Sequence, residues 1–444
     1  MDILIKIVQF LLSLTLLVVV HELGHFIAAR IFRIRVEKFY IFFNPWFSLF
    51  KFRRGQTEYG LGWVPLGGYV KIAGMIDESM DTEQMAAPPK PDEFRSKPAW
   101  QRLIVMVAGV VMNVLLAVAI YCGINYVWGE RYMPVSDARW GFVWSDEGKE
   151  LGFEDGDRIV AINGHAIDDL DEILNELLIT DEDRHVTVLR DGAEQTVVIP
   201  LDRIIEMRRS RSYAELFSLR LPFVVDSVAT PSAVGAGLQR GDRFVAINGQ
   251  PAGYYDQCTP LLQQYRGQTV ALTVARDSLG TTVNRELSVP VSDEGTIGVL
   301  LNNPFRLHTR HYGFWESIPE GFKRTGVEIS NYWEQLKLIV SPRSKMYEEL
   351  GGIIAIGSVF PSTWDWERFW HMTAMLSIIL AVMNLLPIPA LDGGHVLFLL
   401  WEVVTRRKPS EKFLERAQIL GLLILMVLLV YANGNDVHRL LSGN

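Results

Sequence analysis

The chain has 444 residues, of which 49% are hydrophobic and 21% are charged, and its mean hydropathy is +0.15. This composition is too apolar for an ordinary soluble protein and too charged for a chain that lies wholly in a membrane, so we expect a few spanning helices and one or more soluble domains. The net charge of −8 gives no sign of a nucleic-acid partner.

Four segments are long and apolar enough to span a lipid bilayer. They are residues 3–31, 103–128, 369–401 and 417–431. The first lacks an Ala-x-Ala-like cleavage site, so we interpret it as a retained helix. Lysine and arginine cluster in the connections after the first and third segments, which predicts that both connections are cytoplasmic and that the long region between the second and third segments lies on the far side.

The first segment contains the motif His-Glu-Leu-Gly-His. On a helix, His21 and His25 lie one turn apart on the same face, where both imidazoles can bind one Zn²⁺. Glu22 lies beside them as a candidate base for a zinc-activated water. A short motif of this kind also occurs by chance, but polar residues in an apolar segment are costly unless they face a cavity, a partner or a metal.

The first cytoplasmic loop contains an apolar, glycine-rich stretch at residues 57–71, interrupted by Pro65. We expect a β-hairpin or a re-entrant loop there, with an ordinary surface hairpin as the alternative. Residues 77–97 are polar and lack periodicity, so we expect them to be flexible.

The far-side region contains an internal repeat, because residues 152–164 are echoed by residues 237–249. Each copy predicts a turn at Gly-Asp, a short strand and a tight Asn-Gly turn. The pattern resembles PDZ domains, which bind peptide C-termini by strand addition. A spacer role is the alternative, above all for the first copy. Residues 312–340 then predict one or two amphipathic helices on the membrane surface or packed on the second copy.

The third segment is interrupted by Pro387 and Pro389 and carries Asp392 and His395. Backbone groups freed by such a break must face protein, water or metal. Asp392 is a candidate third zinc ligand, which would leave the fourth position for water. His395 is the rival candidate.

The HELGH motif, the later LDGG motif preceded by NxxPxP, and the PDZ-like insertion between them resemble the site-2 protease family. The tandem PDZ-like region is similar to its bacterial branch, the regulators of sigma-E protease. The resemblance covers essentially the whole chain. It implies an intramembrane zinc endopeptidase of the cell inner membrane that cuts single-span membrane proteins, commonly anti-sigma factors that another protease has already trimmed.

The resemblance also implies roles for individual residues. It assigns Zn²⁺ to His21, His25 and Asp392, with Glu22 as the general base. The residues that it places at the substrate are Asn384, Pro65, Gly67, Gly68 and Tyr69. The residues that it places in the structure near the site are Gly109, Asn113, Pro387 and Pro389.

Three stretches depart from the family's motifs. Val110 replaces the proline of GPxxN, residues 42–45 replace a Gly-Phe-Gly turn, and residues 352–354 replace Gly-Pro-Ile. None of them touches the predicted metal ligands, so the departures concern substrate contacts.

We therefore expect a multi-pass α-helical membrane protein with four transmembrane helices, a membrane-associated β-hairpin and two inserted PDZ-like α/β domains. The expected parts are residues 1–128 and 366–444 as the two halves of the transmembrane core, 129–218 and 219–305 as the PDZ-like domains, and 306–365 as membrane-surface helices. Two other functions stay open. One is a membrane-anchored zinc protease acting on cytoplasmic loops, with a glutamate as its third ligand; the other is a non-catalytic scaffold that holds peptides.

Overall fold

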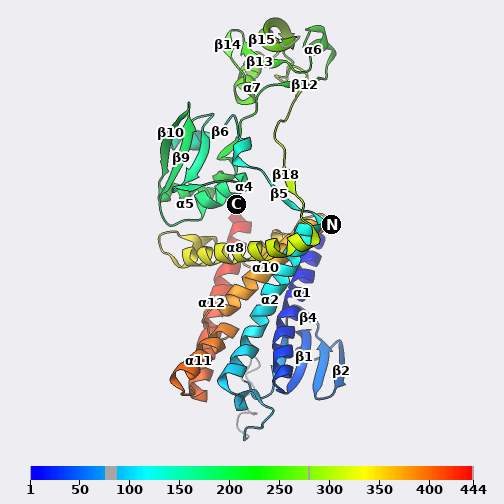
Figure 1. The fold of residues 1–444 in the computed structure, drawn as a ribbon, viewed down its shortest axis with the longest axis vertical. Helices are drawn as coiled ribbons and strands as arrows, with labels where there is room; N and C mark the ends of the chain where they lie inside the picture. The colour runs from blue at the N-terminus through cyan, green and yellow to red at the C-terminus, as the bar shows by residue number, and fades with distance from the viewer. Residues whose placement is uncertain (1, 76–87, 279–280, 443–444) are drawn as a thin grey trace. The chain divides into compact units, whose positions relative to one another are not determined.

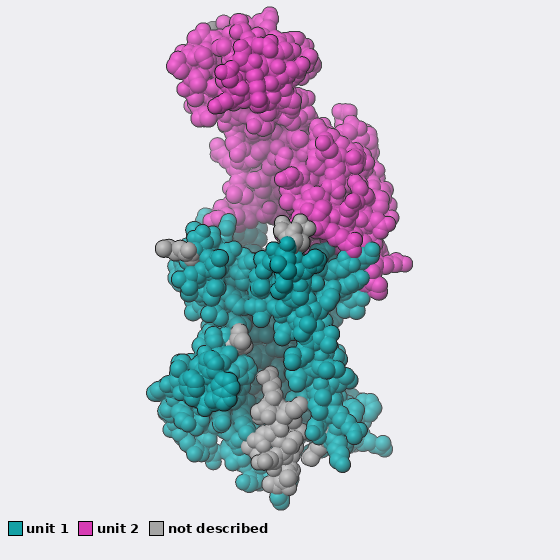
Figure 2. Space-filling view, turned by 180° about the vertical axis from the view of Figure 1, so that it is seen from behind, with its two compact units in different colours: residues 1–130, 310–340, 345–444 teal, residues 131–309, 341–344 magenta. Residues whose placement is uncertain are grey.

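The computed structural model describes residues 2–75, 88–278 and 281–442. The chain divides into two units (Figures 1 and 2). Unit 1 contains residues 1–130, 310–340 and 345–444, and unit 2 contains residues 131–309 and 341–344. Most of the segment predicted to be flexible, residues 77–97, lies outside the described residues. Its end forms a 3-10 helix, η2 (Phe94–Ser96).

Four helices in the described part of unit 1 are long and apolar enough to cross a membrane, which confirms the predicted number. They are α1 (Asp2–Ile31), α2 (Ala99–Val127), α10 (Trp366–Leu385) and α12 (Glu411–Ser442). Helices α1, α2 and α10 lie side by side in Figure 1. Most of the apolar surface of α1 and α12 is exposed, as expected for helices whose solvent is lipid.

The predicted break in the third segment, residues 369–401, is confirmed, because α10 ends at Leu385 and α11 (Asp392–Thr405) is a separate helix. Proline disfavours the helical backbone at the residue before it, and Leu386, which precedes Pro387, is extended with φ −61° and ψ 142°. Since the sequence stays apolar through this turn, hydropathy alone does not locate the end of the span.

Unit 1 also contains a sheet of four strands, β1 (Val36–Phe43), β2 (Phe50–Arg54), β3 (Thr57–Leu61) and β4 (Val64–Ile72), in the order β2-β3-β1-β4. The predicted hairpin at residues 57–71 is therefore wrong. Strand β1 lies between its two arms, parallel to β3 and antiparallel to β4. The hairpin in this sheet is β2–β3. Strand β4 is an edge strand of the sheet and contacts α1.

Residues 314–340 form one helix, α8 (Phe314–Val340), which crosses the ribbon of α2 and α10 in Figure 1 and contacts both helices. It is followed by η5 (Met346–Glu349) and α9 (Ile353–Ser358). The carboxylate of Asp436 on α12 accepts hydrogen bonds of 3.0 Å from the backbone N–H groups of Ile354 and Ala355, so α12 caps α9.

Unit 2 is entered through β5 (Glu130–Tyr132), which pairs with β18 (His308–Arg310), and η3 (Val135–Asp137). Its first repeat copy then has two sheets, β10-β9-β7-β8 and β11-β6, around one hydrophobic core. Its elements are β6 (Phe142–Trp144), α3 (Asp146–Glu150), β7 (Arg158–Ile162), β8 (His165–Ala166), α4 (Leu170–Leu178), β9 (Arg184–Arg190), β10 (Ala193–Ile199), α5 (Leu201–Ser210), η4 (Ser212–Glu215) and β11 (Phe217–Leu219).

The second copy repeats the same order of pairings, with sheets β14-β13-β15-β16 and β12-β17 around its own core. Its elements are β12 (Val225–Val228), α6 (Pro231–Gly235), β13 (Arg243–Ile247), β14 (Gln250–Pro251), α7 (Tyr255–Gln264), β15 (Thr269–Ser278), β16 (Thr281–Pro290) and β17 (Val299–Leu301). In both copies the Asn-Gly pair has positive φ at each residue, as a type I′ hairpin turn requires.

The Gly-Asp signature of each copy marks a buried ion pair. Asp157 is fully buried and accepts two hydrogen bonds, of 2.7 and 2.6 Å, from the guanidinium of Arg190. Asp242 and Arg276 repeat this arrangement at 2.6 and 2.7 Å. Hydrogen bonds to these carboxylates hold the pKa of both guanidinium groups above the ordinary value. Arg190 also donates a 2.8 Å hydrogen bond to the carbonyl of Gly152, and Arg276 donates one of 2.8 Å to the carbonyl of Gly237. The arginine on β9 or β15 is therefore bonded to the loop that precedes β7 or β13.

Removing the aspartate takes away the buried carboxylate of such a pair, and Arg190 then keeps only its ion pair with the exposed Glu154. We expect Asp157→Ala to lower the stability of the first copy by about 3–5 kcal/mol. Hydrogen exchange of the full chain should then show faster exchange in residues 138–219 with the second copy unchanged, and Asp242→Ala should give the reverse pattern. Glu206→Ala, at an exposed surface pair, is the control. Unchanged exchange in both aspartate variants would contradict this role of the pair.

Candidate metal centre

Helix α1 places two imidazoles on its buried face. His21 and His25 are each 7% exposed, and their ring centroids are 4.8 Å apart. The one-turn spacing brings their Nε2 atoms to 3.2 Å from each other. Two histidine nitrogens at this distance point at one common position beside the helix.

Helix α11 supplies a third ligand atom from its first residue. Oδ2 of Asp392 lies 3.1 Å from His21 Nε2 and 3.2 Å from His25 Nε2. These residues form the one such group of histidine, cysteine or carboxylate side chains in the part of the chain that the structure describes. Ligand atoms bound to zinc at about 2.0–2.2 Å in a tetrahedral site lie roughly 3.3 Å apart, so the triangle fits one face of that tetrahedron.

The donor set carries a further sign of a metal site. Oδ2 of Asp392 is buried but accepts no hydrogen bond of ordinary geometry, although both Nε2 atoms are near it. Buried polar atoms nearly always have a partner, and one imidazole lone pair from each histidine is directed at the same point. A zinc ion at this point satisfies all three atoms, so the residues present fit the metal.

Helix α2 sets the orientation of both imidazoles. The Nδ1 atom of His25 lies 2.8 Å from the carbonyl oxygen of Val105, to which it donates, and this leaves Nε2 free to bind a metal. The side-chain amide of Asn113 lies 3.2 Å from Nδ1 of His21, and its Oδ1 is buried without a partner. Turning that amide by 180° places Oδ1 where it accepts the Nδ1–H proton, which leaves Nε2 of His21 as the ligand.

Glycines allow α1 and α2 to approach closely enough for this arrangement. A Cβ atom on Gly24 would lie 2.4 Å from the carbonyl oxygen of Ala108. A Cβ atom on Gly109 would lie 2.4 Å from His25 Nε2 and 2.7 Å from His21 Cε1. The imidazoles therefore lie directly against the α2 backbone at Gly109, where no side chain intervenes, and any larger residue at position 109 displaces them.

The turn before α11 positions Asp392. Pro387 and Pro389 lie in this turn, and Gly393 and Gly394 pack on it so tightly that their added Cβ atoms would meet backbone at 2.1 and 2.5 Å. At the other end of α11, the carboxylate of Glu402 accepts a 2.5 Å hydrogen bond from Arg102 on α2. The carboxylate of Asp392 is thus held by packing at its own end of the helix and by an ion pair at the far end.

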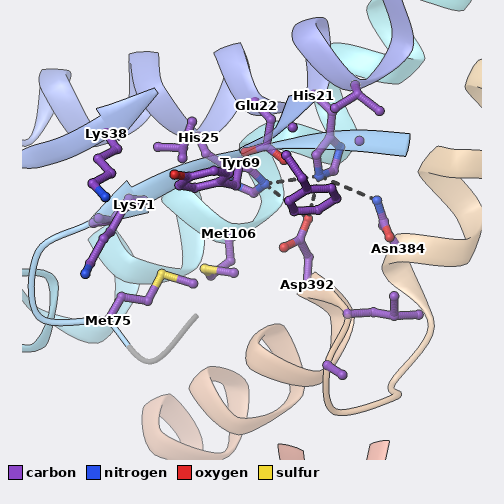
Figure 3. Close-up of a pocket in the computed structure, with 18 of the residues that line it drawn as sticks. His21, Glu22, His25, Lys38, Tyr69, Lys71, Met75, Met106, Asn384 and Asp392 are labelled. Carbon is purple, nitrogen blue, oxygen red and sulfur yellow. Dashed lines mark hydrogen bonds and ion pairs between the residues drawn. The ribbon is translucent and has the colours of Figure 1, made fainter. Parts of the chain in front are cut away.

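A cavity of about 770 Å³ opens on this centre, and we call it the metal-site cavity. It is lined by Glu22 beside the two histidines, by Gly67, Gly68 and Tyr69 of β4, and by Asn384 of α10 (Figure 3). Asn384 Nδ2 lies 3.5 Å from His21 Nε2.

Not every predicted residue lies at this cavity. Pro65 lines a separate small pocket against α1. His395 lines the metal-site cavity but is outside the group of three ligand atoms. Sequence reasoning did not select Lys38 of β1 or Gln418 of α12, which line it as well. For Gln418 a signal was present, since a buried amide in an apolar spanning helix is costly.

Comparison with known proteins bears on the whole chain. A family model described as Peptidase family M50 matches residues 9–428. A protein of Ralstonia nicotianae named "Putative zinc metalloprotease" is 30% identical, over 98% of this chain and 99% of its own length. The regulator of sigma-E protease of Escherichia coli is 29% identical, over 97% and 98%, and that of Salmonella typhimurium is 28% identical, over 99% and 100%.

These matches confirm the resemblance to site-2 proteases. The family match spans α1, which carries His21 and His25, and the turn and helix that carry Asp392. Its members are zinc metalloendopeptidases that act in regulated intramembrane proteolysis. The chain belongs to peptidase family M50, the site-2 protease family, and is a zinc metalloendopeptidase of this kind.

Proposed function

We propose that His21, His25 and Asp392 bind the zinc ion and that Glu22 is the general base of an endopeptidase that cuts single-span membrane proteins within the bundle. The observation that carries the proposal is the triangle of three ligand atoms, 3.1 to 3.2 Å on each side, with Glu22 beside it in a cavity between apolar helices. A zinc ion in this site supplies Lewis-acid chemistry and acidifies water toward a pKa of ~7.

The side chains around the zinc position carry the proton transfers and hold the substrate. Glu22 accepts a proton from the attacking water and passes it to the leaving amine. The amide of Asn384, which reaches to 3.5 Å from His21 Nε2, donates a hydrogen bond to the carbonyl oxygen as charge develops on it. Asn113 and the Val105 carbonyl keep both imidazoles in the tautomer that presents Nε2.

Strand β4 offers the edge that an unwound substrate needs. The amides of a transmembrane helix are hidden in intrahelical hydrogen bonds, so a substrate must become extended before it is cut. An edge strand holds an extended peptide through backbone hydrogen bonds. Gly67, Gly68 and Tyr69 of β4 line the metal-site cavity, and we assign this contact to them rather than to Pro65, which lacks an N–H group and lines another pocket.

We further propose that the two copies in unit 2 are PDZ-like domains on the periplasmic side of the inner membrane. The order of strands and helices that the two copies share supports the PDZ-like fold. The arginine and lysine residues that follow α1 and α11 indicate the cytoplasmic side, which supports a periplasmic position for unit 2. There they would bind peptide C-termini or screen substrates by size. Anti-sigma factors that another protease has trimmed are the substrate class that fits the relatives named as regulators of sigma-E protease.

Glu22→Gln separates metal binding from proton transfer. We expect cleavage of a single-span substrate by the purified chain in detergent to fall by about 10²- to 10⁴-fold, because glutamine cannot accept the proton. Metal analysis should still find zinc, since residue 22 is not a ligand. Glu334→Gln, at an exposed pair on α8, is the control. Cleavage by Glu22→Gln at more than a tenth of the wild-type rate would show that another group is the base.

Gly109→Ala tests the close approach of α1 and α2. The added methyl group overlaps the imidazoles of His21 and His25, so we expect at least a tenfold loss of zinc affinity, measured by competition with a chelator. Gly123→Ala, on the same helix with open space around its added Cβ, is the matched control and should bind zinc like the wild type. Equal zinc affinity in the two variants would refute the packing argument.

A further inference from the structure

The turn before α11 contains a residue in a strained backbone conformation. Ala390 has φ +99°, in a region that residues other than glycine rarely adopt. It lines the metal-site cavity, two positions before Asp392. A conformation of this kind persists only where the surrounding structure holds it, and it occurs most often at functional sites. Contacts around the turn must therefore restrain Ala390.

Helix α12 supplies one of these contacts at Gly421. A Cβ atom on Gly421 would overlap the carbonyl oxygen of Pro389, so the α12 backbone lies directly against the peptide group that links Pro389 to Ala390. On α11, a Cβ atom on Gly394 would lie 2.5 Å from Pro389 Cα. Pro389 is thus held between two helices. Its carbonyl carbon is one of the four atoms that define φ of Ala390, so fixing this peptide group restrains that angle.

Gly421 is one of few residues of α12 that are buried. The others among the described residues of this helix are Gln418, one turn earlier on the same face, and Asp436, which caps α9. Asp436 is 15 residues further along, about 22 Å from Gly421 on the helix axis.

A general packing role does not account for this contact. Small residues commonly let spanning helices approach each other. Gly421, however, meets the peptide group before a strained residue, not the face of another helix. The contact with Pro389 is therefore the place where α12 can act on the metal centre, although α12 supplies none of the three ligand atoms.

We propose that Gly421 is a positioning residue of the protease. Through it α12 packs on the Pro389 carbonyl, keeps Ala390 at positive φ and so holds the Asp392 carboxylate against His21 and His25. The inference rests on the proposed role of Asp392 as a zinc ligand. When the contact is lost, Ala390 relaxes to negative φ, the chain enters α11 in another direction, and the carboxylate moves away from the two histidines.

The test measures the zinc affinity of the purified full chain in detergent, by competition with a chelator. In Gly421→Ala the added methyl group overlaps the Pro389 carbonyl, so we expect zinc affinity to fall by about tenfold or more. Gly434→Ala lies on the same helix with open space around its added Cβ and should bind zinc like the wild type. Equal affinities in these two variants overturn the proposal.

Changes at residue 390 test whether the contact acts through the strained turn. Glycine adopts positive φ without strain. We therefore expect Ala390→Gly to bind zinc within about threefold of the wild type, and Gly421→Ala/Ala390→Gly to bind it about threefold or more tightly than Gly421→Ala. A double variant as weak as Gly421→Ala overturns the proposal. A tenfold loss in Ala390→Gly alone does so too, whether or not Gly421→Ala folds.

Asp392→Ala in the same assay separates this inference from the proposed function. If Asp392→Ala binds zinc like the wild type, the proposed ligand set fails and the positioning role of Gly421 fails with it. If Asp392→Ala loses zinc while Gly421→Ala keeps the wild-type affinity, the positioning role alone fails and the ligand set stands.

Discussion

Two imidazoles and a carboxylate in an apolar bundle need a partner that satisfies all three, and the rest of unit 1 is arranged around this requirement. A metal ion satisfies them only if their lone pairs meet at one point. The two histidines come from one turn of α1, but their rings are held by α2, through the Val105 carbonyl and the amide of Asn113. The approach of α1 to α2 at Gly24 and Gly109 brings those groups within reach.

The proposed third ligand has a different origin. Asp392 comes from a helix that starts only after a proline-containing turn, and two glycines pack that helix on the turn. The break in the span ends α10 and lets a carboxylate approach the histidines from the opposite side. The same break leaves Asn384 near the end of α10, facing the cavity (Figure 3). One local feature, the NxxPxP-LDGG stretch, thus serves both the ligand set and the substrate contact that we propose.

Much of this arrangement could be predicted, because burying a polar residue in an apolar segment costs free energy and such residues therefore indicate a functional site. His21, Glu22, His25 and Asp392 stand out in this way, and the spacing of the first three is local. The sheet could not be predicted as it is. Strands β1 and β3 pair in parallel and are separated in the sequence by β2. Nothing in residues 57–71 alone therefore indicates that β1 lies between β3 and β4. Lys38 was missed for the same reason, since its position opposite Lys71 depends on that pairing. The prolines predicted the break in the third span, but the exact end of α10 at Leu385 could not be located from hydropathy, because the apolar sequence continues through the turn.

The central claim is that His21, His25 and Asp392 together bind one zinc ion, and zinc stoichiometry tests it most directly. The measurement is metal content per chain in purified wild type, Asp392→Ala and His395→Ala. We expect about one zinc per chain in wild type and in His395→Ala, and loss of most of the zinc in Asp392→Ala. Full zinc in Asp392→Ala together with its loss in His395→Ala would contradict the account and move the third ligand to the rival histidine.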